Sequence, residues 1–427
     1  MSERPAGIPP LAGLFGYAEA SHSGYSVDEA ARRLWRIAYT YRRLHAIGVD
    51  VLPATPEWEV KCALGLGVWL DAEHAMVFER RVNELRHPSV DVGTPPDDRL
   101  ALLLDEVARA ADTAELLTGV YLVARGALVD ELTEYLATSN PLADQPSIRI
   151  VEAALRDETR ALAWGRAAVD AIGGEAREWR LHLHDVSAGA PVAVLRSRDD
   201  ARARDREVRR DERFRDPYNE SADIDRYCED PARPADERAY ALAYKRLREM
   251  DVPEWMAPII ADAAGQPWEL IVDLSRQLWD ETRHAMMGEV ALERQGVPFH
   301  AFPVPIEASM ALNTRFTPRE AHLMLWKIEQ DLMAADTGKK HEVEIARAHG
   351  DPLLTTFQDF DWADEVLHAR TGRRSIVAEF ASREAAEAAG DEVIERYEEV
   401  AEELRAHSAQ AEWWPQFVAA MRRGAPR

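Results

Sequence analysis

Apolar residues recur every three or four positions along most of this chain, the spacing expected of one face of an α-helix. The clearest example spans residues 268–294, with an apolar face made by Ile271, Leu274, Leu278, Ala285 and Leu292. Other predicted helices cover about 355–372 and 382–408 and, in the first half, about 27–47, 56–86, 99–138 and 146–173. Residues 190–196 are the best strand candidate, and a weak one. The pattern therefore predicts an all-α protein.

A further helix is predicted from its start signal. Thr317 and Glu320 have the spacing of a capping box, and Pro318 occupies the first helical position, where its missing N–H costs nothing. The apolar periodicity then continues to about residue 348, so a single helix is predicted over 318–348.

Length, charge and cysteine content narrow the class of protein. A chain of 427 residues exceeds one ordinary core, which favours two or three domains. The net charge of −24 disfavours nucleic acid as a partner. Two cysteines make no disulfide framework, no apolar run approaches the ~18 residues of a membrane span, and the N-terminus lacks a signal pattern. A cytoplasmic protein without membrane contact is expected.

The segment 196–234 separates the chain into halves. It is dense in charge and poor in large apolar residues, which predicts a linker between domains at 1–195 and 235–427. An ordered surface belt is the alternative.

The two halves resemble each other. In each, two tryptophans 11 residues apart precede a His-Ala-Met tripeptide, at Trp58, Trp69 and His74 and again at Trp268, Trp279 and His284. Asp-Glu-Thr-Arg-Ala at 157–161 also repeats Asp-Glu-Thr-Arg-His at 280–284, except that Ala161 replaces the histidine. A duplicated helical unit with a degenerate first copy explains this; chance similarity between helical sequences is the alternative.

The second half carries the motifs with clear chemistry. Asp-Glu-Thr-Arg-His at 280–284 is followed 84 residues later by Asp-Glu-Val-Leu-His at 364–368. In each, Glu and His at positions i and i+3 share one helix face, so both can hold the same metal ion: Glu281 with His284, and Glu365 with His368. A lone motif of this kind is weak evidence, but two on separate apolar-periodic helices are strong.

Further acids extend this candidate site. Glu329 lies within the apolar stripe of the 318–348 helix, 36 residues before Glu365. A fourth carboxylate is expected from the preceding helix, where Glu249 is the first choice and Glu254 the substitute, because Pro253 interrupts that helix. Asp361, one turn before Glu365, is an extra ligand, a supporting acid or a helix N-cap.

The acids that precede each motif have a supporting role available. Asp280 and Asp364 are placed to accept the ring N–H of a histidine on the facing helix. Such a hydrogen bond holds the tautomer and the orientation of a metal-binding imidazole.

Together these residues resemble the ferritin-like di-iron carboxylate superfamily, which includes rubrerythrins, the ribonucleotide reductase small subunit, acyl-carrier-protein desaturases and bacterial multicomponent monooxygenases. The resemblance covers about residues 236–372. It implies two ferritin-like four-helix-bundle units, the first degenerate, and two iron ions, with a manganese–iron pair as the alternative. The implied metal ligands are Glu249, Glu281, His284, Glu329, Glu365 and His368, of which Glu281, Glu329 and Glu365 also take part in catalysis.

The resemblance also implies an activity. We expect an oxidoreductase that activates dioxygen and oxidises a small organic substrate by hydroxylation, N-oxygenation, desaturation or oxidative cleavage. An external electron donor is compatible with this function, and so is a homodimer. The alternatives are a metal-handling ferroxidase or peroxide scavenger, and a non-catalytic scaffold with vestigial motifs.

Overall fold

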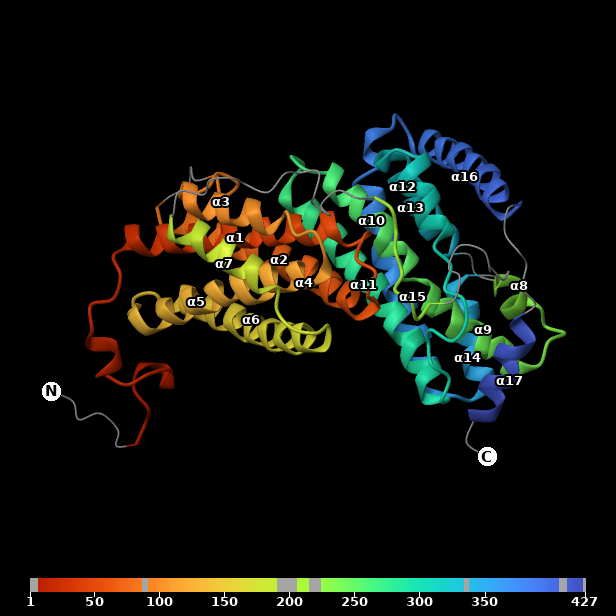
Figure 1. Cartoon of the computed structure of the whole chain (residues 1–427), viewed down its shortest axis with the longest axis horizontal. Coiled ribbons are helices and arrows are strands. Elements are labelled where there is room, and N and C mark those ends of the chain that lie inside the picture. The colour runs from red at the N-terminus through yellow and green to blue at the C-terminus, as the bar shows by residue number, and fades with distance from the viewer. Residues whose placement is uncertain are drawn as a thin grey trace. The chain divides into compact units, whose positions relative to one another are not determined.

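The computed structural model describes residues 7–86, 91–189, 206–214, 224–333, 338–406 and 413–424. Every regular element in these ranges is helical, which confirms the all-α prediction (Figure 1). The strand candidate at 190–196 lies outside the described residues. None of the described helices is both long and apolar enough to span a membrane.

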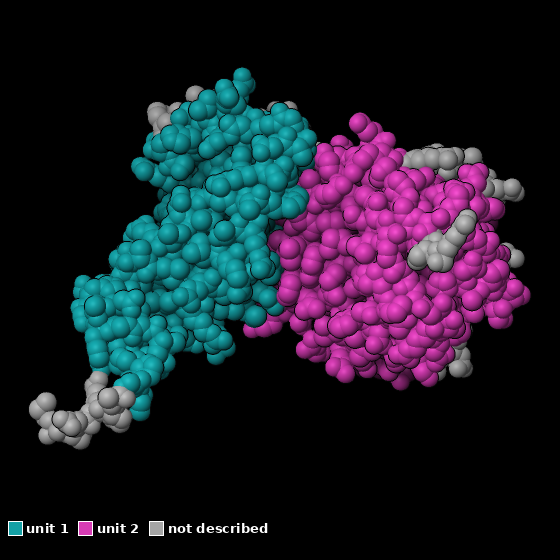
Figure 2. Space-filling model, turned by 90° about the horizontal axis from the view of Figure 1, so that it is seen from below, with its two compact units in different colours: residues 1–47, 70–203 teal, residues 48–69, 204–427 magenta. Residues whose placement is uncertain are grey.

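The chain divides into two compact units (Figure 2). Unit 1 comprises residues 1–47 and 70–203, and unit 2 comprises residues 48–69 and 204–427. Unit 2 thus includes a segment from the first half of the sequence. Part of the expected linker also belongs to it, since the backbone N–H groups of Arg209 and Asp211 donate to the carbonyl oxygens of Pro53 and Pro56 at 3.2 and 3.0 Å.

Unit 1 is built from the helices of the first half. They are η1 (Leu11–Gly13), η2 (Glu19–Ser21), α1 (Val27–Val51), α2 (Trp58–Glu84), α3 (Asp98–Val107), α4 (Thr113–Leu117), η3 (Thr118–Arg125), α5 (Gly126–Thr138), α6 (Gln145–Ala171) and α7 (Arg177–Ala188), with the ends of α1 and α2 in unit 2. The single helix predicted over 99–138 is wrong, because four segments cover that range. Asp97 caps the start of α3, and Asp112 caps the start of α4 after a break at 108–112, each by accepting a backbone N–H group. From α4 onward, η3 and α5 follow without a gap.

Unit 2 contains the remaining helices. They are α8 (Ile224–Glu229), α9 (Ala235–Arg248), α10 (Asp251–Asp262), α11 (Trp268–Arg294), α12 (Glu307–Arg315), α13 (Pro318–Asp331), α14 (Lys339–His349), α15 (Pro352–Arg374), η5 (Val377–Glu379), α16 (Arg383–Ala406) and α17 (Trp414–Gly424). The helices predicted at 268–294, 355–372 and 382–408 are confirmed as α11, α15 and α16.

Two long helices, α11 and α15, form the centre of unit 2. They contact each other, and two pairs of shorter helices flank them: α9 and α10 contact α11, while α14 and α13 contact α15. The shorter helices also contact across, α9 with α14 and α10 with α13. α11 and α15 therefore belong to two successive sets of four contacting helices, the first completed by α9 and α14 and the second by α10 and α13. The breaks between α9 and α10 and between α13 and α14 separate the two sets.

The predicted continuous helix over 318–348 is wrong at its middle. The capping box at Thr317 and Glu320 starts α13 as expected, but α13 ends at Asp331, and Gly338 with extended backbone precedes α14. The other break follows from the sequence. Pro253 lies in the first turn of α10, where a proline is tolerated, and Glu249 becomes the C-cap of α9.

Candidate metal centre

Two groups of acids and histidines lie in unit 2, and all their members are buried except Glu249, which is partly buried. The Glu249 group comprises Glu249, His284, Asp361 and Glu365, and the Glu329 group comprises Glu281, Glu329, Glu365 and His368. Within each group, one nitrogen or carboxylate oxygen from every residue lies within 4.8 Å of the others. Glu365 belongs to both groups, so the two form one cluster.

The cluster lies where α9 gives way to α10 and where α13 ends before α14. Glu281 lies at the midpoint of α11, and Glu365 lies near the middle of α15. Glu249 is the C-cap of α9, and Glu329 lies in the last turn of α13. Long helices therefore carry the two Glu-x-x-His motifs, and the ends of shorter helices bring the remaining acids to them.

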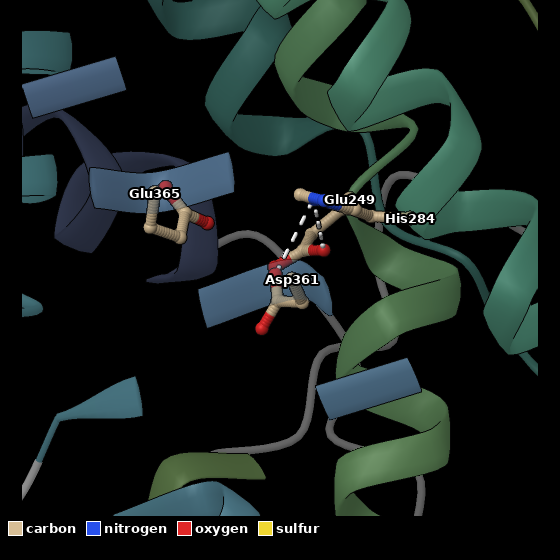
Figure 3. Close-up of side chains that lie close together, drawn as sticks. All are labelled: Glu249, His284, Asp361 and Glu365. Atoms are coloured by element: carbon tan, nitrogen blue, oxygen red, sulfur yellow. Dashed lines mark ion pairs between the residues drawn. The ribbon is translucent and has the colours of Figure 1, made fainter. Parts of the chain in front are cut away.

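In the Glu249 group, His284 turns its Nδ1 atom toward the acids. This atom lies 3.3 Å from Asp361, 3.4 Å from Glu249 and 3.5 Å from Glu281. Figure 3 shows the ring of His284 directed toward the carboxylates of Glu249 and Asp361, while Glu365 projects from the next turn of the Asp361 helix. Asp361 is completely buried inside α15, so it is a member of the site and not a helix cap.

His368 has the same orientation in the Glu329 group. Its Nδ1 atom lies 3.2 Å from Glu365, 3.3 Å from Glu281 and 3.6 Å from Glu329. Glu281 therefore faces both histidines, through Oε2 toward His284 and Oε1 toward His368.

The outer ring nitrogens contact acids on the facing helix. Nε2 of His284 lies 3.1 Å from Asp364, and Nε2 of His368 lies 3.5 Å from Asp280. Arg283 donates to both acids at 2.6 Å and so ties α11 to α15. Burial would raise the pKa of Asp280, but hydrogen bonds from His368 and Arg283 lower this pKa to about 2. Both imidazoles are thus oriented with Nδ1 inward.

The surrounding charge also shifts the proton affinities of the inner groups. Burial alone would lower the pKa of His284 and of His368, yet the nearby acids raise both pKa values well above the usual range. Burial and the charge of Glu365 raise the pKa of Glu329 well above normal. These shifts reflect a cluster with more acid than its two histidines can neutralise.

Two buried cations enter the Glu249 group, and no feature of the sequence distinguished them. Nζ of Lys339, the first residue of α14, lies 2.9 Å from Glu365, 3.0 Å from Asp361 and 3.5 Å from Glu249. Arg246 forms ion pairs with Glu249 at 2.8 Å and with Asp361. Apolar periodicity identifies buried faces but not a lysine that reaches an acid from another helix.

A glycine one turn after each site histidine allows the helices to approach. A Cβ atom at Gly288 would lie 2.2 Å from the backbone nitrogen of Leu247 in α9. A Cβ atom at Gly372 would lie 2.6 Å from the Trp326 ring in α13. The recurring spacing Glu-x2-His-x3-Gly was a sequence signal for these contacts that the pattern analysis missed.

All six expected metal ligands are brought together, and Asp361 joins them. Glu254 does not, because it is buried in a separate network with Lys61 and Arg210. Of the two choices for the carboxylate before α11, Glu249 is therefore the one in the cluster.

The donor atoms suit a hard metal ion. Four buried polar atoms of the cluster have no hydrogen-bond partner: Glu249 Oε2, His284 Nδ1, Glu329 Oε2 and Asp361 Oδ2. Unpaired buried polar atoms are costly, and coordination of a cation would satisfy them. Carboxylate-rich sites with one imidazole per metal fit iron and manganese. In the Glu329 group Lys339 contacts only Glu365, through the oxygen Oε1 that faces away from His368. In the Glu249 group, by contrast, Lys339 and Arg246 both contact Glu249 and Asp361.

Unit 1 has a related arrangement with a different centre. Arg125 donates to Asp71 at 2.7 and 3.0 Å and to Glu158 at 2.8 Å, and all three side chains are buried. His74 lies 3.4 Å from Asp157 instead. In unit 1 a guanidinium group therefore neutralises the two buried acids Asp71 and Glu158.

A cleft of about 420 Å³ lies among α10, α11, α13 and α15, and none of the cluster residues lines it. Its lining includes Leu270, His322 and Thr371. Thr371 lies one turn after His368, and His322 lies two turns before Glu329, so the cleft follows the helices that carry the Glu329 group.

Comparison with known proteins identifies no relative. No protein-family model, no curated protein and no solved structure matches this chain.

Proposed function

We propose that unit 2 is a ferritin-like di-iron carboxylate oxidoreductase, in which a metal-bound cluster activates dioxygen to oxidise a small organic substrate. The observation that carries the proposal is the sharing of Glu365 by two buried groups, each with one histidine Nδ1 directed inward. A manganese–iron pair is compatible with the same donor atoms.

The proposal assigns each ligand a place. Glu281 and Glu365 lie between the two groups and would bridge them, with Glu329 and His368 on one side and Glu249, Asp361 and His284 on the other. When bound, the metal ions would supply the electrons and the open positions at which dioxygen reacts.

The protein's own contribution is orientation and exclusion of water. Asp280 and Asp364 hold the two imidazoles in place and would keep their inner nitrogens available as ligands. Burial of the acids keeps bulk water from competing for the metal. Gln277 donates to Glu329 at 3.1 Å and so holds one oxygen of this carboxylate while the other stays unpaired.

We place the substrate in the cleft beside Thr371. Its volume of about 420 Å³ is within the range of small-molecule sites. Charged side chains at its rim, Arg374 with Asp273 at 2.9 Å and Arg319 with Glu379 at 2.8 Å, are already paired. A neutral or weakly polar molecule fits such a lining best.

The decisive experiment is metal analysis with the optical spectrum of the ferrous protein after exposure to oxygen. We expect bound iron or manganese and a charge-transfer band that Glu281→Ala and His368→Ala remove. His74→Ala is the matched control, because this histidine of unit 1 lies beside Asp157 and outside the cluster of unit 2. Well under one metal ion per chain would overturn the proposal, and oxygen consumption that only accumulates ferric core would favour iron handling.

A further inference from the structure

Lys339 contacts three of the four residues of the Glu249 group, through Glu249 Oε1, Asp361 Oδ1 and Glu365 Oε1. Its side chain is completely buried, and its ammonium lies between three acids, at 2.9 to 3.5 Å from Glu365, Asp361 and Glu249. A metal ion bound to the same oxygens would lie about 2.0–2.2 Å from each, so an ammonium group at its present distance leaves it no room.

The charge of the cluster leads to the same result. The two groups contain five acids, Glu249, Glu281, Glu329, Asp361 and Glu365, and two cations contact them, Lys339 and Arg246. If all five acids are ionised, three negative charges remain for metal ions to neutralise. One divalent ion leaves a single negative charge, whereas two would leave the buried cluster positive while both cations stay.

The chain neutralises acids in this way elsewhere. In unit 1 the guanidinium of Arg125 binds both Asp71 and Glu158, with no more than 6% of any of the three side chains exposed. A fixed internal cation between paired carboxylates is thus an arrangement this sequence already uses.

Resting on the proposed function, we infer that Lys339 is a built-in counter-ion that makes the two metal positions unequal. The Glu329 group binds the first metal ion. The Glu249 group binds a second ion only when the ammonium of Lys339 moves away from Glu249, Asp361 and Glu365. Lys339 is therefore a positioning residue that sets metal stoichiometry, and it stabilises the metal-free protein.

The test is anaerobic titration with Mn(II), in which free Mn(II) is counted by electron paramagnetic resonance. The wild type should bind one ion tightly, and Lys339→Met should gain a second site or bind it at least tenfold more tightly. Lys340→Met is the matched control, because this neighbouring lysine is 56% exposed and should leave the titration unchanged.

A second readout needs no added metal. Thermal unfolding of the metal-free Lys339→Met protein should occur about 6 °C or more below the wild type, because three buried acids lose their counter-ion. Excess Mn(II) should raise the unfolding temperature of Lys339→Met by more than it raises that of the wild type. An unchanged unfolding temperature would contradict the role of Lys339.

Two histidine variants keep the inference testable if Lys339→Met does not fold. His284→Ala should retain the single tight Mn(II) site, and His368→Ala should lose it. Two equal sites in the wild type, unaffected by Lys339→Met, would overturn this inference but leave the proposed function standing. No Mn(II) bound by any of these proteins would overturn both.

Discussion

Gly288 offers a way to disturb one half of the metal centre without altering a ligand. It lies on α11 one turn after His284, and a Cβ atom there would lie 2.2 Å from the backbone nitrogen of Leu247 and 2.5 Å from its Cα. Since these are backbone atoms, no side-chain rotation can relieve the contact. Gly288→Ala must therefore push α9 away from α11.

The size of the effect follows from ordinary contact distances. Non-bonded heavy atoms approach to about 3.5 Å, so α9 must shift by about 1 Å. Overpacking of this kind costs about 1–3 kcal/mol, of which the better helix propensity of alanine returns about 1 kcal/mol. We expect unit 2 to lose up to about 2 kcal/mol of unfolding free energy, or up to about 8 °C in unfolding temperature.

The metal centre should respond unequally. Glu249 lies two residues after Leu247 and moves with it, and metal–ligand distances tolerate only about 0.2 Å. The Glu249 group should lose affinity for Mn(II), whereas the Glu329 group, which takes no residue from α9, should keep its own. Calorimetric unfolding with and without Mn(II), together with the titration, measures both effects.

Gly126→Ala is the matched control, because a Cβ atom at this helical glycine would have no neighbour within 4 Å. This variant should gain up to about 1 kcal/mol of unfolding free energy. If Gly288→Ala also raises the unfolding temperature and binds Mn(II) like the wild type, the close approach of α9 to α11 does not position the site.

Three other perturbations test the same structure. Gly372→Ala should weaken the Glu329 group instead, through displacement of Trp326, and an unchanged first Mn(II) affinity would contradict this. Arg125→Leu should lower the free energy of unfolding by about 3–5 kcal/mol, because two buried acids lose their partner. The control Arg160→Leu, at an exposed position, should not lower it. Equal chemical-denaturation curves for the two variants would refute the ion-pair account. The raised pKa values of both site histidines keep them protonated near neutral pH in the absence of metal, so Mn(II) uptake should release protons and weaken as pH falls. Calorimetry in two buffers of different ionisation enthalpy should then give different heats, and identical heats would refute proton release.

The sequence by itself determined the helical class and the two long helices of unit 2. Both properties are local, since apolar spacing sets the buried face and the capping box at Thr317 sets a helix start. Glu281 and His284, like Glu365 and His368, share a face because a helix brings positions i and i+3 together. Their convergence could be predicted once each pair was placed on an apolar-periodic helix.

Only the tertiary structure decided what else enters the site. Arg246 on α9 and Lys339 on α14 both contact Asp361 on α15, and the sequence around each cation does not indicate these contacts between helices. The division of the 318–348 region into α13 and α14 likewise overrode a continuous apolar pattern. Helix periodicity encodes which face is buried, whereas the partner of a buried charge depends on contacts between segments that local propensity does not specify.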